Sequence, residues 1–243
     1  MFSLSLAEIP LTCELRFPDT ANYLNNFLSD IPAQENLVAV HNKLVESYLH
    51  ECSSVAYSAA DEYHLLHLVA SNMLLAYNRC VFHGTAFLWH EKAWIFSAPS
   101  GTGKTTQYRR WRKLYRDEVE ILNGDKPILE FKEDHTIMVH PSPWKGKERW
   151  GSMLKAPLGG IIYLKQGKEN KIECMAPQDA VIPLYKQFLF LPEKEEYIHA
   201  VCRMEDTLLR NIPVWKLINK GDLESAQLTH DVLLKYMEEH SNV

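Results

Sequence analysis

Short runs of alternating or continuous apolar residues follow one another along the chain, and stretches with helical spacing interrupt them. The strand-like runs cover residues 2–9, 11–17, 80–89, 92–98, 120–131, 135–142, 156–167 and 213–219. Helical spacing appears at 61–77, from 104 onward, over 179–210 and after residue 222. Strands interspersed with helices predict an α/β fold, and the hairpin-like pairs favour a mixed sheet over a purely parallel one.

Two of the expected helices begin at an aspartate. Asp61 is the expected N-cap of the first of them, and Asp222 is the expected N-cap of the last. The apolar stripe of the first helix, which should face the core, comprises Leu65, Leu68, Val69, Met73 and Ala76.

The expected elements fall into two parts with no repeat or low-complexity linker between them. Residues 1–80 should form an α+β segment that packs on the core. Residues 81–243 should form that core, which we expect to be one compact unit.

The composition indicates the class of protein and the compartment in which we expect it. The chain has 243 residues, of which 46% are hydrophobic and 23% charged, as in ordinary globular proteins. Its net charge of −5 gives no general attraction to nucleic acid or to an anionic membrane. No apolar run approaches the roughly 20 residues of a membrane helix, and the first residues make a poor signal peptide. We therefore expect a cytoplasmic protein that binds neither nucleic acid nor membrane.

The cysteines support a reducing compartment. Their number is odd and they stand singly, which argues against a disulfide framework and against a thiolate zinc site. They are Cys13, Cys52, Cys80, Cys174 and Cys202.

The strongest local pattern is APSGTGKTT, residues 98–106, between an expected strand and an expected helix. Small residues let backbone N–H groups surround phosphate oxygens, and the helix that follows points its positive end at the same anion. Lys104 would reach the outer phosphates, and the Thr105 hydroxyl would bind Mg²⁺. The pattern predicts a site for ATP and Mg²⁺; the alternative is a chance glycine-rich turn. The expected nucleotide contacts are Ser100, Gly101, Thr102, Gly103, Lys104, Thr105 and Thr106.

This loop and its flanks resemble the superfamily of the phosphoenolpyruvate carboxykinases and the HPr kinase/phosphorylases. His83-Gly84-Thr85 matches the element that precedes the loop in that superfamily, and Asp125 matches an aspartate at the end of the next strand. The likeness is specific over residues 81–129 and looser to residue 167. It implies a mixed-sheet nucleotide-binding core of the carboxykinase and HPr-kinase type.

The resemblance implies roles for Asp125 and His83. Asp125 would be a carboxylate near the γ-phosphate, acting as general base or as metal anchor. The family usually has two adjacent aspartates, whereas Lys126 follows Asp125 here, so both roles stay open. His83 would lie near the phosphate or its metal, since imidazole is both a ligand and a proton acceptor. A turn aspartate and a structural histidine are the alternatives.

Two basic segments have competing interpretations. The helix after the loop carries Arg109, Arg112, Lys113 and Arg116 on one stripe, which we expect to be a solvated face; the alternative is a docking surface for an acidic partner. The segment 142–150 resembles a loop near the active site of related kinases, which would contact the nucleotide or the acceptor; the alternative is a basic surface hairpin. Its basic residues are Lys145, Lys147 and Arg149.

The resemblance implies an ATP- and Mg²⁺-dependent phosphotransferase that moves the γ-phosphate to a hydroxyl, foremost a serine of a protein or peptide, with Asp125 as the base. A kinase of a small hydroxylated metabolite is one alternative, and a nucleotide-binding regulatory protein without catalysis is another. Carboxykinases are much longer, and their additional substrate-binding segments have no counterpart here. Relatives often assemble, so a homo-oligomer is also open.

Overall fold

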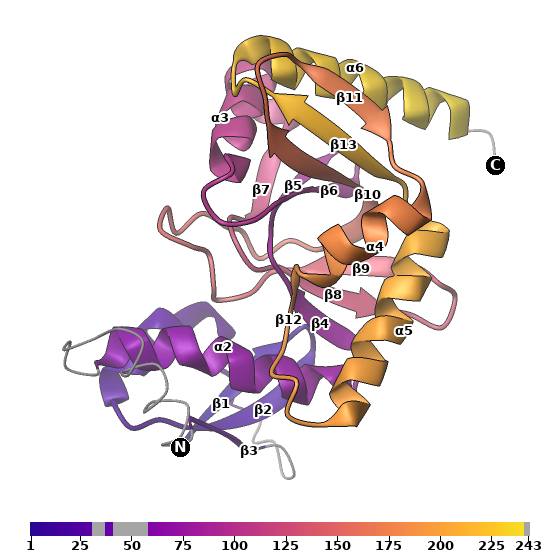
Figure 1. Ribbon diagram of the computed structural model, residues 1–243. Coiled ribbons are helices and arrows are strands. Elements are labelled where there is room, and N and C mark those ends of the chain that lie inside the picture. Colours follow the sequence, from indigo (N-terminus) through magenta and orange to yellow (C-terminus); the bar gives the residue numbers. More distant parts are fainter. Residues whose placement is uncertain (31–36, 41–57, 241–243) are drawn as a thin grey trace.

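The computed structural model describes residues 1–30, 37–40 and 58–240 (Figure 1). Its order of elements is that of a mixed α/β protein with one large mixed sheet and a separate small sheet, in agreement with the expected fold class. The four cysteines in these ranges are free thiols, and Cys52 lies outside them. Within the same ranges, every helix is too short or too polar to cross a bilayer.

Among its described residues, the N-terminal part has the small sheet, two short 3-10 helices and one long helix (Figure 1). β1 (Phe2–Leu6) pairs antiparallel with β2 (Ile9–Glu14), and β3 (Leu37–Ala39) lies parallel to β2. η1 (Pro18–Tyr23) and η2 (Asn25–Phe27) precede α2 (Ala59–Leu75). Val81, Ile128 and Trp144 of the second part share a buried cluster with residues of this part. The expected boundary at residue 80 falls inside β4 (Arg79–Phe82). The division of the chain into two parts stays a prediction.

The start of α2 corrects the expectation that Asp61 is its N-cap. Ser58 is the N-cap, its Oγ accepts from the Asp61 N–H, and the Asp61 carboxylate accepts from the Ser58 N–H at 2.9 Å. This reciprocal pair is a capping box. The buried face of α2 also differs from the expected apolar stripe, because α2 has neighbours on several sides. Of that stripe, Leu65 is buried. Leu68, Val69 and Met73 are half-buried, and Ala76 is exposed.

The large sheet has ten strands. Eight of them follow one path: β12 (Phe188–Leu189), β4, β8 (Ile128–Phe131), β9 (Ile137–His140), β10 (Ala156–Gln166), β6 (Lys92–Ser97), β5 (Gly84–Trp89) and β7 (Glu120–Asn123). β13 (Val214–Asn219) lies parallel to β10, and β11 (Lys171–Cys174), which the pattern did not predict, pairs antiparallel with β13. β6, β10 and β13 are mutually parallel and the other pairs are antiparallel, which makes the sheet mixed.

Two stretches that look like single strands in the sequence are each broken in the middle. Residues 80–89 divide into β4 and β5 around His83, and residues 120–131 divide into β7 and β8 around residues 124–127. β4 pairs with β8 in one half of the sheet, while β5 pairs with β7 in the other half. The chain therefore crosses between the halves at both of these breaks, and the two crossings touch: Gly84 N–H donates to the Asp125 carbonyl at 2.9 Å.

Helices cover both faces of the sheet. α3 (Lys104–Tyr115), followed by the short η3 (Arg116–Glu118), and α6 (Leu223–His240) pack on one face; α4 (Pro177–Tyr185) and α5 (Glu195–Asn211) pack on the other. The helical spacing expected over 179–210 is thus two helices, separated by β12. Asp222 accepts from the Ser225 N–H at 2.9 Å, so its expected capping role is confirmed.

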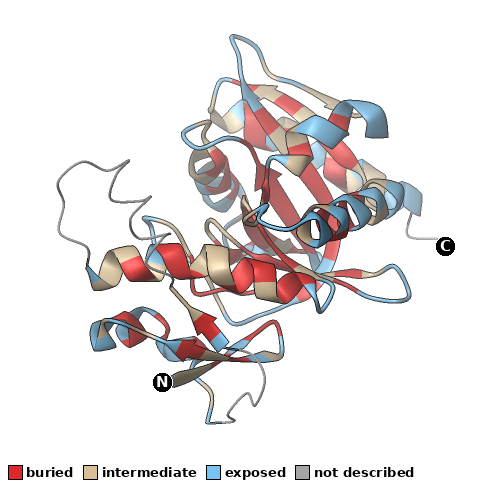
Figure 2. Ribbon diagram, turned by 60° about the horizontal axis from the view of Figure 1, so that its bottom comes forward, coloured by how far each residue is buried: buried red, intermediate tan, exposed pale blue. Residues whose placement is uncertain are grey.

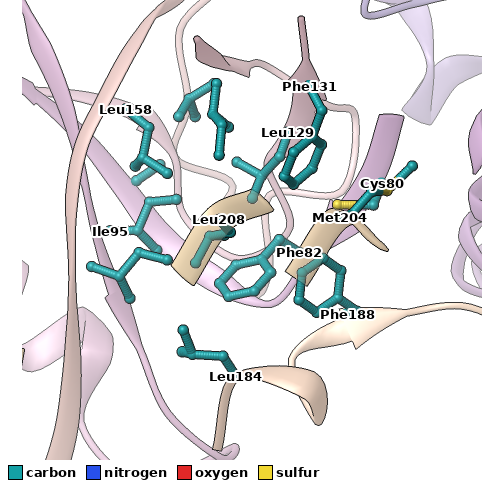
Figure 3. Packing of buried hydrophobic residues seen from close by; sticks show 14 of the residues in the cluster. Cys80, Phe82, Ile95, Leu129, Phe131, Leu158, Leu184, Phe188, Met204 and Leu208 are labelled. Atoms are coloured by element: carbon teal, nitrogen blue, oxygen red, sulfur yellow. The ribbon is translucent and has the colours of Figure 1, made fainter. Parts of the chain in front are cut away.

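The strands lie between two hydrophobic clusters, as their alternation requires. Ile95 and Ile161 face α4 and α5, whereas their chain neighbours Phe96 and Ile162 face α3 and α6. Figure 2 shows the buried strands of this layer between half-buried and exposed helices. Figure 3 shows the α4/α5 side, where Leu184, Phe188 and Leu208 pack around Phe82 and its neighbours.

Candidate functional site

The glycine loop connects the end of β6 to the start of α3. Gly101 has φ +80° and Gly103 has φ +113°, backbone conformations that residues with a side chain rarely adopt. A Cβ at Gly101 would meet nothing within 4 Å, so the loop borders open space. No side chain caps the first turn of α3, which leaves its N–H groups available to an anion. The residues present therefore fit a phosphate group.

Lys104 is folded against the loop that precedes it. Its ammonium donates to the Ala98 carbonyl at 2.9 Å and to the Pro99 carbonyl at 3.4 Å. The pKa of Lys104 is lowered to about 8, mainly by burial. The negative charge of Asp125 raises this pKa, and the positive charge of Lys126 lowers it. A phosphate in the loop would supply the negative charge that the buried ammonium lacks.

A cavity of about 1060 Å³ lies in front of the loop. All the site residues expected from the sequence border it except Thr102, which lines an adjoining cavity of about 360 Å³ with Gln166 and Asn219. Those on the main cavity are Ser100, Gly101, Gly103, Lys104, Thr105 and Thr106 of the loop, His83 and Asp125 of the crossings, and Lys145, Lys147 and Arg149.

His83 and Asp125 face each other because they lie on the two touching crossings. His83 Nε2 is 3.5 Å from Asp125 Oδ1, and the Lys126 ammonium forms an ion pair with Asp125 Oδ2. Burial would raise the pKa of Asp125, but the hydrogen bond from His83 and the charge of Lys126 outweigh burial and hold it well below its usual range. Asp125 is therefore ionised, and the next residue, Lys126, is a cation.

Asn123 shapes the turn that carries Asp125, a role that the sequence analysis missed. Its Oδ1 accepts from the backbone N–H groups of Asp125 and Lys126 at 2.9 and 2.8 Å. Its Nδ2 donates to the Ser142 carbonyl at 3.1 Å and to Ser142 Oγ at 3.0 Å. An asparagine that bonds the backbone two residues ahead is a common turn device, so the Asn-Gly pair after the strand was the available signal.

The basic loop, residues 142–150, packs directly on Asp125. Gly146 has φ +73°, and a Cβ there would come within 2.9 Å of the Asp125 Cβ. Trp144 is buried, and its indole N–H donates to the Tyr63 carbonyl at 3.0 Å. Gly146 thus permits a close approach between two anchored segments.

The N-terminal part contributes a further wall of the cavity, which no sequence motif predicted. Tyr23 stacks on Tyr63 with 5.0 Å between ring centroids, and the Arg149 guanidinium lies 5.9 Å from the Tyr23 ring. The remaining residues of this wall are Asn22, Asn25, Asn26, Phe27, Ala60 and His64. Residues distant in sequence from the glycine loop therefore help to enclose the space in front of it.

The helix after the loop is amphipathic, as favoured from the sequence. Tyr108 and Trp111 are buried, whereas Arg112, Lys113 and Arg116 are exposed. Arg109 differs from its neighbours on the basic stripe: it pairs with Glu148 at 2.9 Å and lies 5.2 Å from the Trp150 ring. Arg109 therefore links α3 to the basic loop.

A magnesium ion would depend on the nucleotide for most of its ligands. Within the described ranges, no group of three or more His, Cys, Asp or Glu side chains is arranged to hold a metal. Thr105 and Asp125 both border the main cavity. Since Mg²⁺ typically keeps several waters and binds through one or two carboxylates plus substrate phosphates, this small set of ligands fits an ion that arrives with ATP.

Comparison with known proteins gives little beyond the general fold. No protein-family model matches the chain, and no curated protein matches its sequence. Among solved structures, the HPr(Ser) kinase/phosphatase from Coxiella burnetii is similar with a TM-score of 0.40 and 8% identity, over 67% of this chain and 99% of that one. This is a weak structural relationship.

Proposed function

We propose that the protein is an ATP- and Mg²⁺-dependent phosphotransferase that moves the γ-phosphate to a hydroxyl, with a serine of a protein or peptide as the expected acceptor. One observation carries the proposal: Lys104, His83 and Asp125 come from three separate segments and border one cavity. An anion-binding loop and an ionised carboxylate on one cavity are two of the parts that phosphoryl transfer uses.

Asp125 has two tasks in this proposal, as metal ligand and as base, and each other group has one. The loop N–H groups and Lys104 hold the β- and γ-phosphates, and Thr105 and Asp125 hold Mg²⁺, which neutralises charge on the phosphates when bound. Lys145, Lys147 and Arg149 add positive charge to the cavity wall, where they contact the phosphates or the acceptor. The N-terminal wall encloses the acceptor side.

The transfer step needs a place for one proton. The acceptor oxygen forms a bond to the γ-phosphorus, the bond from that phosphorus to the bridging oxygen of ADP breaks, and Asp125 takes the hydroxyl proton. The low pKa of Asp125 means that its carboxylate holds this proton weakly. Before transfer, the contact with His83 Nε2 at 3.5 Å helps to keep this carboxylate ionised.

The test separates binding from transfer. Calorimetry with Mg·ATP should give saturable binding to the wild type and none to Lys104→Ala, while Lys113→Ala on the exposed face of α3 should bind as the wild type does. Asp125→Asn should retain binding and reduce transfer, detected by mass spectrometry of serine peptides, by about 10²- to 10⁴-fold, the usual contribution of a general base.

Other outcomes would favour other functions. Equal binding to the wild type and Lys104→Ala would remove the glycine loop from the proposal. An unchanged rate in Asp125→Asn would remove the base. The ion pair between Asp125 and Lys126 favours the regulatory alternative, which would gain if ATP binds but no peptide, protein or hydroxylated metabolite is phosphorylated.

A further inference from the structure

The second cavity, of about 360 Å³, lies at the carboxyl ends of three parallel strands. β6 ends at the glycine loop, while β10 and β13, the next strands in this part of the sheet (Figure 1), end at Gln166 and Asn219. Gln166 and Asn219 are partners in the strand register, and both line the cavity together with Thr102 of the loop. In open α/β sheets, ligands bind in the crevice outside the carboxyl ends of the strands. The position of this cavity in the sheet is therefore typical of a ligand site.

The two cavities adjoin at the glycine loop. Gly103 and Thr106 line both of them, whereas Asp125 borders the main cavity and Thr102 the second one. A triphosphate on the loop that directs its γ-phosphate to Asp125 therefore directs its other end to the second cavity. In a nucleotide, that end carries the ribose and the base.

Two amide side chains in the second cavity have acceptor atoms to spare. Asn219 is only 7% exposed, and its Nδ2 donates to the Lys165 carbonyl at 3.3 Å. Gln166 Nε2 lies 3.5 and 3.4 Å from the carbonyl oxygens of Gly101 and Thr102. Because carbonyl oxygens only accept, both amide nitrogens face the protein, and neither amide oxygen has a hydrogen-bond partner in the part of the chain that the structure describes. The hydroxyl and amino groups of a nucleoside are donors that match these oxygens.

The wall that β13 contributes is held in place by contacts within the protein. The Gly167 N–H donates to the Asn219 carbonyl at 3.0 Å, which joins the ends of β10 and β13. The Gly221 carbonyl accepts from Arg110 Nε of α3 at 3.0 Å, which joins the turn after β13 to the helix that follows the glycine loop. A wall that is ordered before a ligand arrives lowers the entropic cost of binding.

We propose that the second cavity holds the nucleoside half of the nucleotide, with the amide oxygens of Asn219 and Gln166 accepting from its hydroxyl or amino groups. The inference rests on the proposed function, in which a triphosphate occupies the glycine loop. It adds the residues that distinguish a nucleotide from an inorganic polyphosphate. The main cavity then remains for the terminal phosphates and the acceptor.

Calorimetry on the full chain can compare Mg·ATP with Mg·tripolyphosphate, which has three linked phosphates but no nucleoside. The wild type should bind ATP about 10-fold more tightly or better, because the nucleoside adds hydrogen bonds. Gln166→Trp should fill the cavity from an exposed position, weaken ATP binding by about 10-fold or more and leave tripolyphosphate binding unchanged. Gln166→Leu removes only the amide, so its affinity for ATP should lie between those of the wild type and Gln166→Trp. The control Gln178→Trp, on the exposed surface of α4, should match the wild type with both ligands.

Asn219→Leu tests the buried acceptor and should also weaken ATP binding alone. Because Asn219 is buried in the sheet, this variant can lose stability, and the Gln166 variants keep the test independent of folding.

Hydrogen exchange gives the location of the nucleoside directly. Exchange at residues 166–167 and 219–221 should slow with Mg·ATP but not with Mg·tripolyphosphate, while exchange at 98–106 should slow with both. Equal wild-type affinity for the two ligands would overturn the proposal, as would an equal loss of both affinities in Gln166→Trp. If neither ligand binds the wild type, the proposed function itself is contradicted, and this inference with it.

Discussion

At the scale of single residues, the site depends on charged side chains whose environment changes their affinity for protons. Lys104 is buried against carbonyl groups, and Asp125 is held between an imidazole and an ammonium. Residue types and spacing identified both positions in the sequence. Their electrostatics depend on burial and on contacts across the two crossings, and the sequence carries neither.

The pKa of Lys104 predicts how nucleotide affinity depends on pH. Because the pKa is about 8 before nucleotide binds and phosphates bind the protonated form, the affinity for Mg·ATP should be nearly constant from pH 7 to 8. Above pH 8 it should fall by up to about tenfold per pH unit, as a proton must be taken up on binding. Calorimetry across pH 7–9.5 measures this.

Lys104→Arg is the matched control, because a guanidinium stays charged over this whole range. Its affinity should be weaker at neutral pH, since its shape differs from that of the ammonium, but independent of pH. The same decline above pH 8 in this variant would assign the pH dependence to another group.

At the scale of elements, α2 ties the N-terminal wall of the cavity to the core. Glu62, buried in its first turn, accepts from the N–H groups of Arg16 and Phe17 at 2.6 and 3.1 Å and from Thr20 Oγ1 at 2.5 Å. The sequence pattern predicted this helix, but the expected N-cap, Asp61, and the expected buried face were wrong. A buried glutamate does not count as apolar in such a pattern. A charged residue thus fixes the segment that carries Tyr23.

Removing the Glu62 carboxylate should loosen that segment. Glu62→Ala removes the acceptor of two backbone N–H groups and leaves the Thr20 hydroxyl only the Ala59 carbonyl at 3.2 Å. This should cost about 3 kcal/mol or more of the free energy of unfolding. Amide hydrogen exchange over residues 16–27 should accelerate. Glu62→Gln keeps one acceptor oxygen, so its exchange rate should lie between those of the wild type and Glu62→Ala. The exposed control Glu238→Gln should match the wild type. Unchanged exchange over 16–27 in Glu62→Ala would contradict this account of the segment.

At the scale of the whole molecule, the site exists because two of the crossings between the halves of the sheet lie against each other. One crossing carries His83, the other carries Asp125, and the glycine loop follows a strand that continues the same sheet. A ligand that contacts all three should therefore protect them together.

Mg·ATP at about 100 times its Kd should stabilise the fold by about 2.7 kcal/mol, which raises Tm by roughly 5–10 °C in a chain of this size. Hydrogen exchange should slow at residues 82–85, 98–106 and 124–127 in parallel. Lys104→Ala should show neither effect. Protection confined to residues 98–106 would mean that the crossings do not take part in binding.

The sequence by itself determined the mixed α/β class, the glycine loop with its lysine, the cap at Asp222 and the identity of the candidate residues. These follow from periodicity and from local backbone chemistry, which short stretches of chain carry in full. Only the tertiary structure decided that two apparent strands break at His83 and Asp125, that Asn123 shapes the turn that carries Asp125, and that the N-terminal part encloses the cavity. Strand breaks and contacts of this kind arise from pairing between segments distant in sequence, and local hydrophobic pattern contains no record of which segments pair.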